Sequence, residues 1–193
     1  CKSHNALFHC DTVQSVGHFK LDFSEIPVDF TAVSAHKFHG PKGVGFAFIR
    51  KNSGLKPMIV GGSQERGIRA GTESVHNIVG LSEALNISYA NLEEEKAYIK
   101  SLKQYFKDQL QEHIPEASLN GGCSDNDNST YTLLNVCLPI AEEKAVLLLF
   151  QLDIKGIACS KGSACQSGSA AGSHVLTEIL NEDHMNLDLD IDP

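Results

Sequence analysis

The most chemically specific feature of this chain is a lysine set among small polar residues and glycines. Lys37 lies in the segment SAHKFHGPKG at residues 34–43, directly after an apolar stretch, and Asp11 lies upstream in the segment DTVQ at residues 11–14. A lysine amine condenses with an aldehyde to form an imine, small polar neighbours bind a phosphate, and a distant carboxylate balances a pyridinium ring. Together these residues predict a site for an aldehyde cofactor, pyridoxal phosphate.

Each requirement of that cofactor has a candidate residue in the two segments. Asp11 follows a predicted strand, so it can face a cleft at the carboxyl end of the sheet. From there its carboxylate can keep the ring nitrogen of the cofactor protonated. Gln14 comes three residues later, so one helical turn would place it on the same face, within reach of the phenolic oxygen. Ser34 and His36 flank Lys37 and offer donors to the phosphate. A single lysine is usually a solvated charge and an aspartate after a strand usually caps a helix, so the prediction depends on the combination.

The second candidate centre is the cysteine of the segment KGSACQSGS at residues 161–169. Its glycine and serine neighbours predict a loop that can bring a thiol into a cleft, and a nucleophilic thiol must be exposed and partly ionised. Cys165 is therefore the candidate nucleophile, with Lys161 favouring its anion. Burial is the weaker reading for Cys165, because its neighbours offer little apolar packing. For Cys159, which follows a short apolar stretch, burial is the preferred reading.

The residue pattern predicts an α/β fold around these motifs. Short apolar runs bounded by polar residues, glycine or proline predict strands at residues 6–9, 30–33 and 44–49, and residues 11–16 predict one helical turn. Apolar residues recur with helical spacing from residue 74 to residue 115, and so long a helix is typical of one that leaves one domain and enters another. The elements predicted beyond it are a polar turn (120–129), a strand (131–138), a helix (141–152), a strand (154–158) and a helix (172–180).

The composition excludes several classes of protein. The net charge of −8 and the absence of any run of lysines or arginines make nucleic acid an unexpected ligand. The longest apolar run, at residues 145–150, is too short to span a bilayer, so we expect no membrane segment. Six irregularly spaced cysteines without a secretory leader predict reduced thiols and a cytoplasmic location.

Three motifs resemble those of the cysteine desulfurases, which are fold-type I pyridoxal phosphate enzymes of the class-V aminotransferase type. They are DTVQSVG at residues 11–17, SAHK with GPKG at residues 34–43, and GGSQERGIRAGT at residues 61–72. The segment at residues 161–169 resembles the active-cysteine loop of the branch that serves iron–sulfur cluster assembly. The resemblance implies the C-terminal part of a fold-type I enzyme, with residues 1–90 as the remainder of the large cofactor-binding domain and residues 91–193 as a small α/β domain that carries the cysteine loop.

The resemblance also implies the role of each candidate residue. Thr72 would reach the phosphate bound by a neighbouring subunit, which implies a homodimer. Cys165 would take the sulfur of L-cysteine as a persulfide, leave L-alanine, and pass the sulfur to an acceptor or to an iron–sulfur scaffold protein. Lys37 would be the Schiff-base lysine. The residues expected to bind the cofactor are Asp11, Gln14, Ser34, His36, Lys37 and Thr72.

The chain departs from the family pattern at both ends. It begins just before the aspartate motif, so the phosphate loop, the ring-stacking imidazole and the asparagine that precede this motif in the family are not in it. The family's arginine for the substrate carboxylate would lie beyond its end, and Arg66 and Arg69 of the glycine-rich loop are not assigned that role. We therefore expect a piece of a desulfurase, which alone lacks part of the residues that the family uses for catalysis.

Two other readings stay open. One is a different reaction on the same scaffold, either aminotransfer or selenocysteine lysis, which the cofactor motif alone does not exclude. The other is a non-catalytic metal, sulfur-carrier or interaction module. The cysteines and histidines that a metal would use are spaced by 6, 9 and 10 residues, which matches no common zinc pattern. These residues are Cys159, Cys165, His174 and His184.

Overall fold

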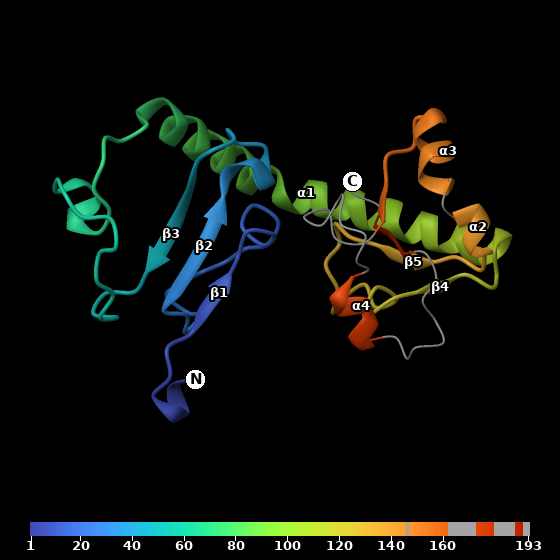
Figure 1. Cartoon of the computed structure of the whole chain (residues 1–193), viewed down its shortest axis with the longest axis horizontal. Coiled ribbons are helices and arrows are strands. Elements are labelled where there is room, and N and C mark those ends of the chain that lie inside the picture. The colour runs from blue at the N-terminus through green and yellow to red at the C-terminus, as the bar shows by residue number, and fades with distance from the viewer. Residues whose placement is uncertain (146, 162–172, 180–187, 191–193) are drawn as a thin grey trace. The chain divides into compact units, whose positions relative to one another are not determined.

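The computed structural model describes residues 1–145, 147–161, 173–179 and 188–190. The chain divides into two compact units, Cys1–Glu94 and Glu95–Pro193. The long helix α1 (Val75–His113) begins in the first unit and ends in the second (Figure 1). The predicted helix from residue 74 to residue 115 is thus confirmed. Among the helices of the described ranges, none is both long enough and apolar enough to span a membrane.

The first unit contains a three-stranded sheet made of β1 (His9–Asp11), β2 (Phe30–Ser34) and β3 (Gly45–Ile49). β2 lies in the centre, parallel to β1 and antiparallel to β3 (Figure 1). Two of the predicted strands are confirmed. The strand predicted at residues 6–9 is wrong, because pairing with β2 begins only at His9 and continues to Asp11. Asp11 is therefore the last residue of a strand.

A small hydrophobic core holds the two turns that follow β1 and β2. Val16 comes from the first turn, Val33 from β2 itself, and Ala35 and Phe38 from the second turn, and all four are buried. α1 covers this cluster with Leu81, Ala84 and Leu85, which are partly buried against it. Because burial of one large apolar side chain contributes about 1.5–3 kcal/mol, the core fixes both turns relative to the sheet.

Three short 3₁₀ helices complete this unit. η1 (Lys2–His4) lies near the start of the chain and η2 (Ala35–Phe38) follows β2 directly. η3 (Gln64–Gly67) has two consecutive non-glycine residues in the left-handed region, with φ angles of 48° and 56°. The residue types expected in that region are glycine and asparagine, so η3 is a strained turn.

The second unit contains a four-stranded antiparallel sheet in the order β4-β5-β7-β6. Its strands are β4 (Ser118–Leu119), β5 (Asn135–Cys137), β6 (Ser160–Lys161) and β7 (Asp188–Asp190), and its other helices are α2 (Glu142–Ala145), α3 (Leu148–Ile154) and α4 (His174–Ile179). α4 confirms the helix predicted at residues 172–180. The strand predicted at residues 131–138 is confirmed only for its last part, β5.

The helix predicted at residues 141–152 is confirmed for most of its length, as the two helices α2 and α3. The strand predicted at residues 154–158 is wrong, because Ile154 still belongs to α3. Gly156, with φ 75°, closes this helix: its N–H bonds to Asp153 O at 2.8 Å, and the N–H of Ile157 bonds to Leu152 O at 3.0 Å. Paired bonds of this kind around a left-handed glycine form a Schellman motif.

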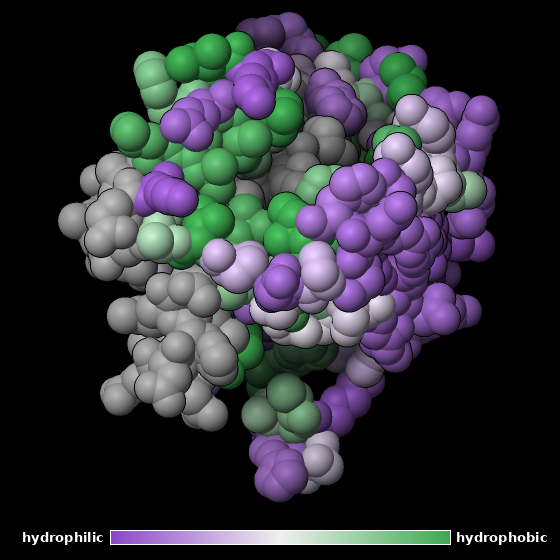
Figure 2. Space-filling model, turned by 90° about the vertical axis from the view of Figure 1, so that its right-hand side faces the viewer, coloured by the Kyte–Doolittle hydropathy of each residue, from purple (hydrophilic) through white to green (hydrophobic). Residues whose placement is uncertain are grey.

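α3 leaves apolar side chains on the surface. Leu147, Phe150 and Ile154 are 55%, 64% and 70% exposed. Residues three and four apart share one face of a helix, so these three form a stripe. Figure 2 shows hydrophobic residues grouped over part of this side of the molecule, next to hydrophilic ones. Grouped exposed apolar residues are typical of surfaces that another segment or partner covers.

Candidate functional site

Parallel pairing of β1 and β2 brings the aspartate segment and the lysine segment to one edge of the sheet. Asp11 lies opposite Ala32 in the register, and β2 then continues through Ser34 into η2, which contains His36 and Lys37. Parallel strands end at the same edge, which in open α/β sheets is where ligands bind. The structure thus places the aspartate segment and the lysine segment at one edge.

Three contacts join the turn after β1 to β2 and to the turn after β2. The backbone N–H and the hydroxyl of Thr12 both donate to Ala32 O, at 3.1 and 3.0 Å. Gly17 packs so closely against Phe38 that a Cβ built on it would lie 2.6 Å from the Phe38 Cβ. The ring of His18 bonds to the backbone oxygen of Lys37 at 3.0 Å. The two turns therefore form one fixed substructure.

The lysine turn is also fixed from its own side. Its first residue, Ala35, is fully buried and donates its N–H to Val44 O at 3.0 Å, and Phe38 is 1% exposed. His39 adopts the left-handed conformation with φ 65°, and Gly40 then donates its N–H back to Ala35 O at 2.9 Å. Between the two buried residues, His36 is exposed and Lys37 is half-buried.

The polar atoms that would hold the cofactor are not used by the fold. Asp11 accepts one hydrogen bond, from the N–H of Val13 to Oδ1 at 2.9 Å, which leaves Oδ2 without a partner in the described part of the chain. The remaining predicted binding groups make no side-chain hydrogen bond or ion pair within the described residues. They belong to Gln14, Ser34, His36, Lys37 and Thr72. The donor set fits pyridoxal phosphate, which needs an amine, a carboxylate and several phosphate donors.

Thr72 lies on a different segment, between η3 and α1, and is exposed. Arg69 stabilises this segment through two ion pairs, in which its guanidinium lies 2.7 Å from the carboxylate of Glu73 and 3.6 Å from that of Glu65. The N–H of Ala70 bonds to Ile59 O at 3.0 Å, which ties the segment to the preceding loop. Thr72 makes no hydrogen bond to the Lys37 turn among the described residues.

Cys165 lies outside the described residues, as do most of the residues around it. Cys159, six residues earlier, is described and packs against a cluster around Ala145 that includes Leu148 and Leu152. Burial, together with the nearby carboxylate of Asp153, raises the pKa of its thiol above 9.0. A raised thiol pKa means less thiolate at neutral pH, so Cys159 is a poor nucleophile.

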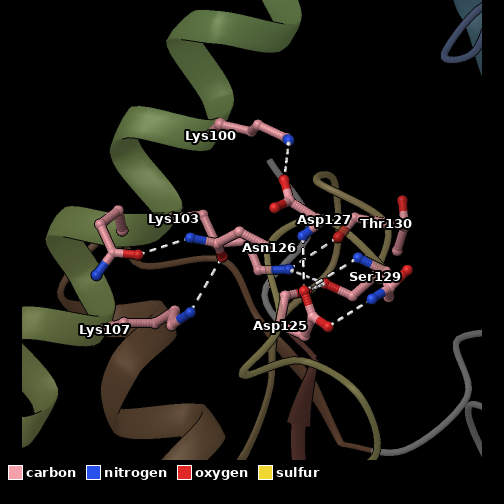
Figure 3. Close-up of polar contacts among 10 residues, drawn as sticks. Lys100, Lys103, Lys107, Asp125, Asn126, Asp127, Ser129 and Thr130 are labelled. Atoms are coloured by element: carbon pink, nitrogen blue, oxygen red, sulfur yellow. Dashed lines mark hydrogen bonds and ion pairs between the residues drawn. The ribbon is translucent and has the colours of Figure 1, made fainter.

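The densest polar network lies in the second unit and is structural (Figure 3). Lys103 is 7% exposed and donates to Ser129 Oγ at 3.1 Å and Thr130 O at 2.8 Å. Two more lysines on the same side of α1 reach this loop: Lys107 Nζ contacts Ser124 O at 2.8 Å, and Lys100 pairs with Asp127 at 3.6 Å. The network fixes residues 124–130 against the helix.

An open groove of about 250 Å³ borders this loop. Gly121 and Gly122 lie along it, and a Cβ on either would meet no atom within 4 Å. Cys123, Leu176 and Ser173 contribute to its walls. The groove contains none of the predicted site residues that the structure describes.

The metal hypothesis gains no support from the described residues, since no three side chains of His, Cys, Asp or Glu gather there. Of the four proposed ligands, Cys165 and His184 lie outside the described part of the chain.

Sequence reasoning missed two residues that shape the site. Thr12 holds the aspartate turn through two hydrogen bonds to the backbone oxygen of Ala32. His18 holds the lysine turn through a hydrogen bond to the backbone oxygen of Lys37. A threonine beside the aspartate is a weak signal, and nothing in the sequence indicates which carbonyl an imidazole will bind.

Comparison with known proteins shows the family of this chain. Residues 1–185 match the aminotransferase class-V family. A cysteine desulfurase IscS from Dictyoglomus turgidum is 40% identical over 178 residues, which cover 92% of this chain and 44% of that protein. The chain thus spans about half the length of the curated relatives it matches.

Solved structures agree with this result. A NifS-like protein superimposes with a TM-score of 0.83 at 30% identity, covering all of this chain and 48% of that one. SspA, solved in complex with cysteine, superimposes with a TM-score of 0.70 at 30% identity, covering 99% of this chain and 51% of that one. These similarities confirm the predicted fold class.

Proposed function

The chain belongs to the aminotransferase class-V family, and on that premise we propose that it is part of a pyridoxal phosphate-dependent cysteine desulfurase. The enzyme would remove sulfur from L-cysteine, release L-alanine and keep the sulfur as a persulfide on Cys165. The observation that carries the proposal is the set of unused polar side chains on the joined turns after β1 and β2. The similarity to cysteine desulfurases, and to SspA solved with cysteine, supports cysteine as the substrate.

The residues of the sheet edge would hold the cofactor as follows. Lys37 would bind its aldehyde carbon through Nζ, and the free Oδ2 of Asp11 would hold the proton of the ring nitrogen. Gln14 would bind the ring oxygen, while Ser34 and His36 would donate to the phosphate. When bound, the cofactor supplies an electron sink for bond breaking at the substrate's α-carbon.

Cys165 would supply the nucleophile. Its thiolate would attack the sulfur of the bound cysteine and form a sulfur–sulfur bond while the carbon–sulfur bond of the substrate breaks, with that electron pair left on the departing carbon skeleton. The substrate's amine would take the place of Lys37 on the cofactor, which would free Nζ of the half-buried Lys37 to take the proton of the substrate's α-carbon and later return it. The proton given up by the Cys165 thiol on ionisation would complete the methyl group of alanine. Cys159 is the less reactive thiol, since burial raises its pKa.

A homodimer would complete the site. Thr72 lies away from the Lys37 turn along the chain and has an unused hydroxyl, as expected of a residue that serves a neighbouring subunit. The loop tied to its segment exposes Met58, Ile59 and Val60 by 94%, 59% and 80%. Methionine and other apolar side chains are enriched at the centres of protein interfaces, so we place the dimer contact at this loop.

The sulfur would pass from Cys165 to an acceptor protein, with an iron–sulfur scaffold as the expected class. The five cysteines that the structure describes are all free thiols. Free thiols persist in reducing compartments, so we propose a cytoplasmic location.

The test is cofactor capture followed by product analysis. Protein carrying this sequence, both as this chain and within its longest native polypeptide, should turn yellow with pyridoxal phosphate. Borohydride should bleach the colour and leave a cofactor-sized mass on the peptide that contains Lys37. With L-cysteine the longer protein should form sulfide and alanine in equal amounts. Keto-acid formation would favour an aminotransferase, a strong preference for selenocysteine would favour a lyase, and absence of the Lys37 adduct would refute the proposal.

A further inference from the structure

We infer that His18 is a positioning residue for Lys37, an inference that rests on the proposed function. The Nε2 atom of His18 lies 3.0 Å from the backbone oxygen of Lys37. A carbonyl oxygen only accepts hydrogen bonds, so Nε2 carries the proton and donates it. The bond therefore holds the backbone of the residue whose amine would bind the cofactor.

His18 is itself held on both sides. Its backbone N–H bonds to Ser15 O at 3.1 Å, within the turn that begins at Asp11. The next residue, Phe19, accepts a bond from the hydroxyl of Tyr89 on α1 at 3.3 Å. The imidazole thus connects the aspartate turn to the lysine turn from an anchored backbone.

The position of the lysine backbone matters because its side chain is long and flexible. Ordering such a side chain costs conformational entropy, and any freedom of its Cα adds to that cost. The neighbours of Lys37 are already fixed, since Ala35 and Phe38 are buried. The bond from His18 is made to the backbone oxygen of Lys37 itself. It therefore fixes the backbone position from which the lysine side chain extends to the cofactor.

The sharpest test compares His18→Gln with His18→Met. The two new side chains have similar length and volume, but only glutamine keeps a donor at its end. We expect His18→Met to weaken cofactor binding about five- to tenfold, which is the effect of losing one hydrogen bond, and His18→Gln to recover most of that loss. Cofactor affinity is measured from the yellow band, and the fraction of Lys37 trapped by borohydride is measured by mass spectrometry.

His113 provides a matched control in the second unit. Its Nδ1 lies 3.0 Å from Gln109 O in the last turn of α1, so His113→Met also removes a bond between an imidazole and a carbonyl. This variant should bind the cofactor as the unchanged protein does. Tm is recorded for all variants, because a general loss of stability would affect both methionine variants.

The outcomes separate this inference from the proposed function. If the unchanged protein forms no Lys37 adduct, the proposed function fails first. If it forms the adduct and His18→Met binds the cofactor equally well, the positioning role is refuted. If His18→Met does not fold, the unchanged protein is tested by nitrogen-15 NMR of the His18 ring. Its Nε2–H signal should then shift when the cofactor is trapped on Lys37, and an unmoved signal would refute the role.

Discussion

Gly17 and Phe38 are in such close contact that only a glycine fits: an added Cβ would lie 2.6 Å from the Phe38 Cβ and 3.2 Å from its Cγ. Gly17 also has φ 86°, a conformation that disfavours any side chain. The contact joins the turn that carries Asp11 and Gln14 to the turn that carries Lys37.

Gly17→Ala should therefore lower the free energy of unfolding by about 2–5 kcal/mol, the sum of a left-handed alanine and an overpacked core. Gly43→Ala is the matched control, because Gly43 has φ 83° and no atom within 4 Å of an added Cβ. It should lose only about 1–2 kcal/mol, the conformational part. Urea unfolding measures both, and equal losses would show that the contact with Phe38 does not matter.

Cys165→Ser should abolish the release of sulfide from cysteine while leaving the yellow colour of bound cofactor, because only the nucleophile is removed. Cys159→Ser should retain activity within about twofold, since its thiol is held mostly protonated and packs against the cluster around Ala145. Sulfide and alanine assays measure both variants. Sulfide release that survives in Cys165→Ser and disappears in Cys159→Ser would reverse the assignment.

Lys103 should give the stability of the second unit a pH dependence in alkaline solution. Burial lowers the pKa of Lys103 below 10.5. Between that lowered value and 10.5 the unfolded chain binds more protons than the folded one, so the free energy of unfolding rises with pH through this interval. Lys103→Met should remove this rise. Lys100→Met, which breaks the pair with the exposed Asp127, should keep most of it, because burial is the main cause of the lowered pKa of Lys103 and the charge of Lys100 is a minor one. Unfolding measured across the interval tests the difference.

Asp125 should make the loop at residues 124–130 sensitive to acid. The side-chain amide of Asn128, followed by the backbone N–H groups of Asp127 and Asn128, holds the pKa of Asp125 below 3.8. The carboxylate therefore stabilises the fold above pH 3.8, and this contribution is lost as the pH falls through the lower, folded-state value.

Hydrogen exchange should show the amides of Asp127 and Asn128 losing protection in that acid range. Asp125→Ala should show the same loss already at neutral pH. Asp22→Ala is the control: Ser24 lowers the pKa of Asp22 in a similar way, but in the first unit. If its effect on the loop amides equals that of Asp125→Ala, the local explanation is wrong.

The sequence predicts best those features whose signal is long or local. Apolar spacing sustained over 39 residues defines α1 clearly, and short apolar runs bounded by polar residues, glycine or proline define β2 and β3. Local chemistry also shows that the aspartate and lysine segments belong together, and the parallel pairing of β1 with β2 explains how they meet.

Features that depend on partners distant in sequence were missed. β7 is only three residues long and pairs with β5 and β6, so its own residues carry almost no pattern. β1 starts later than its apolar run because Ala6 to Phe8 have no strand partner in the register with β2. The end of α3 is different. Glycine is a common helix C-cap residue, so Gly156 indicates a helix end in the sequence, although the apolar pattern around it predicts a strand.

α1 supplies core residues to both units: Leu81, Ala84 and Leu85 pack in the first, and Leu110 packs in the second. Helices owe most of their stability to tertiary packing, so unfolding of one unit weakens the helix against which the other unit packs. Calorimetry should therefore record one endotherm in which both units unfold together, in place of two separate endotherms. Two glycines introduced near Glu94 should split this endotherm into two. Glu94 is the last residue of the first unit and lies within α1, the helix through which unfolding of one unit affects the stability of the other.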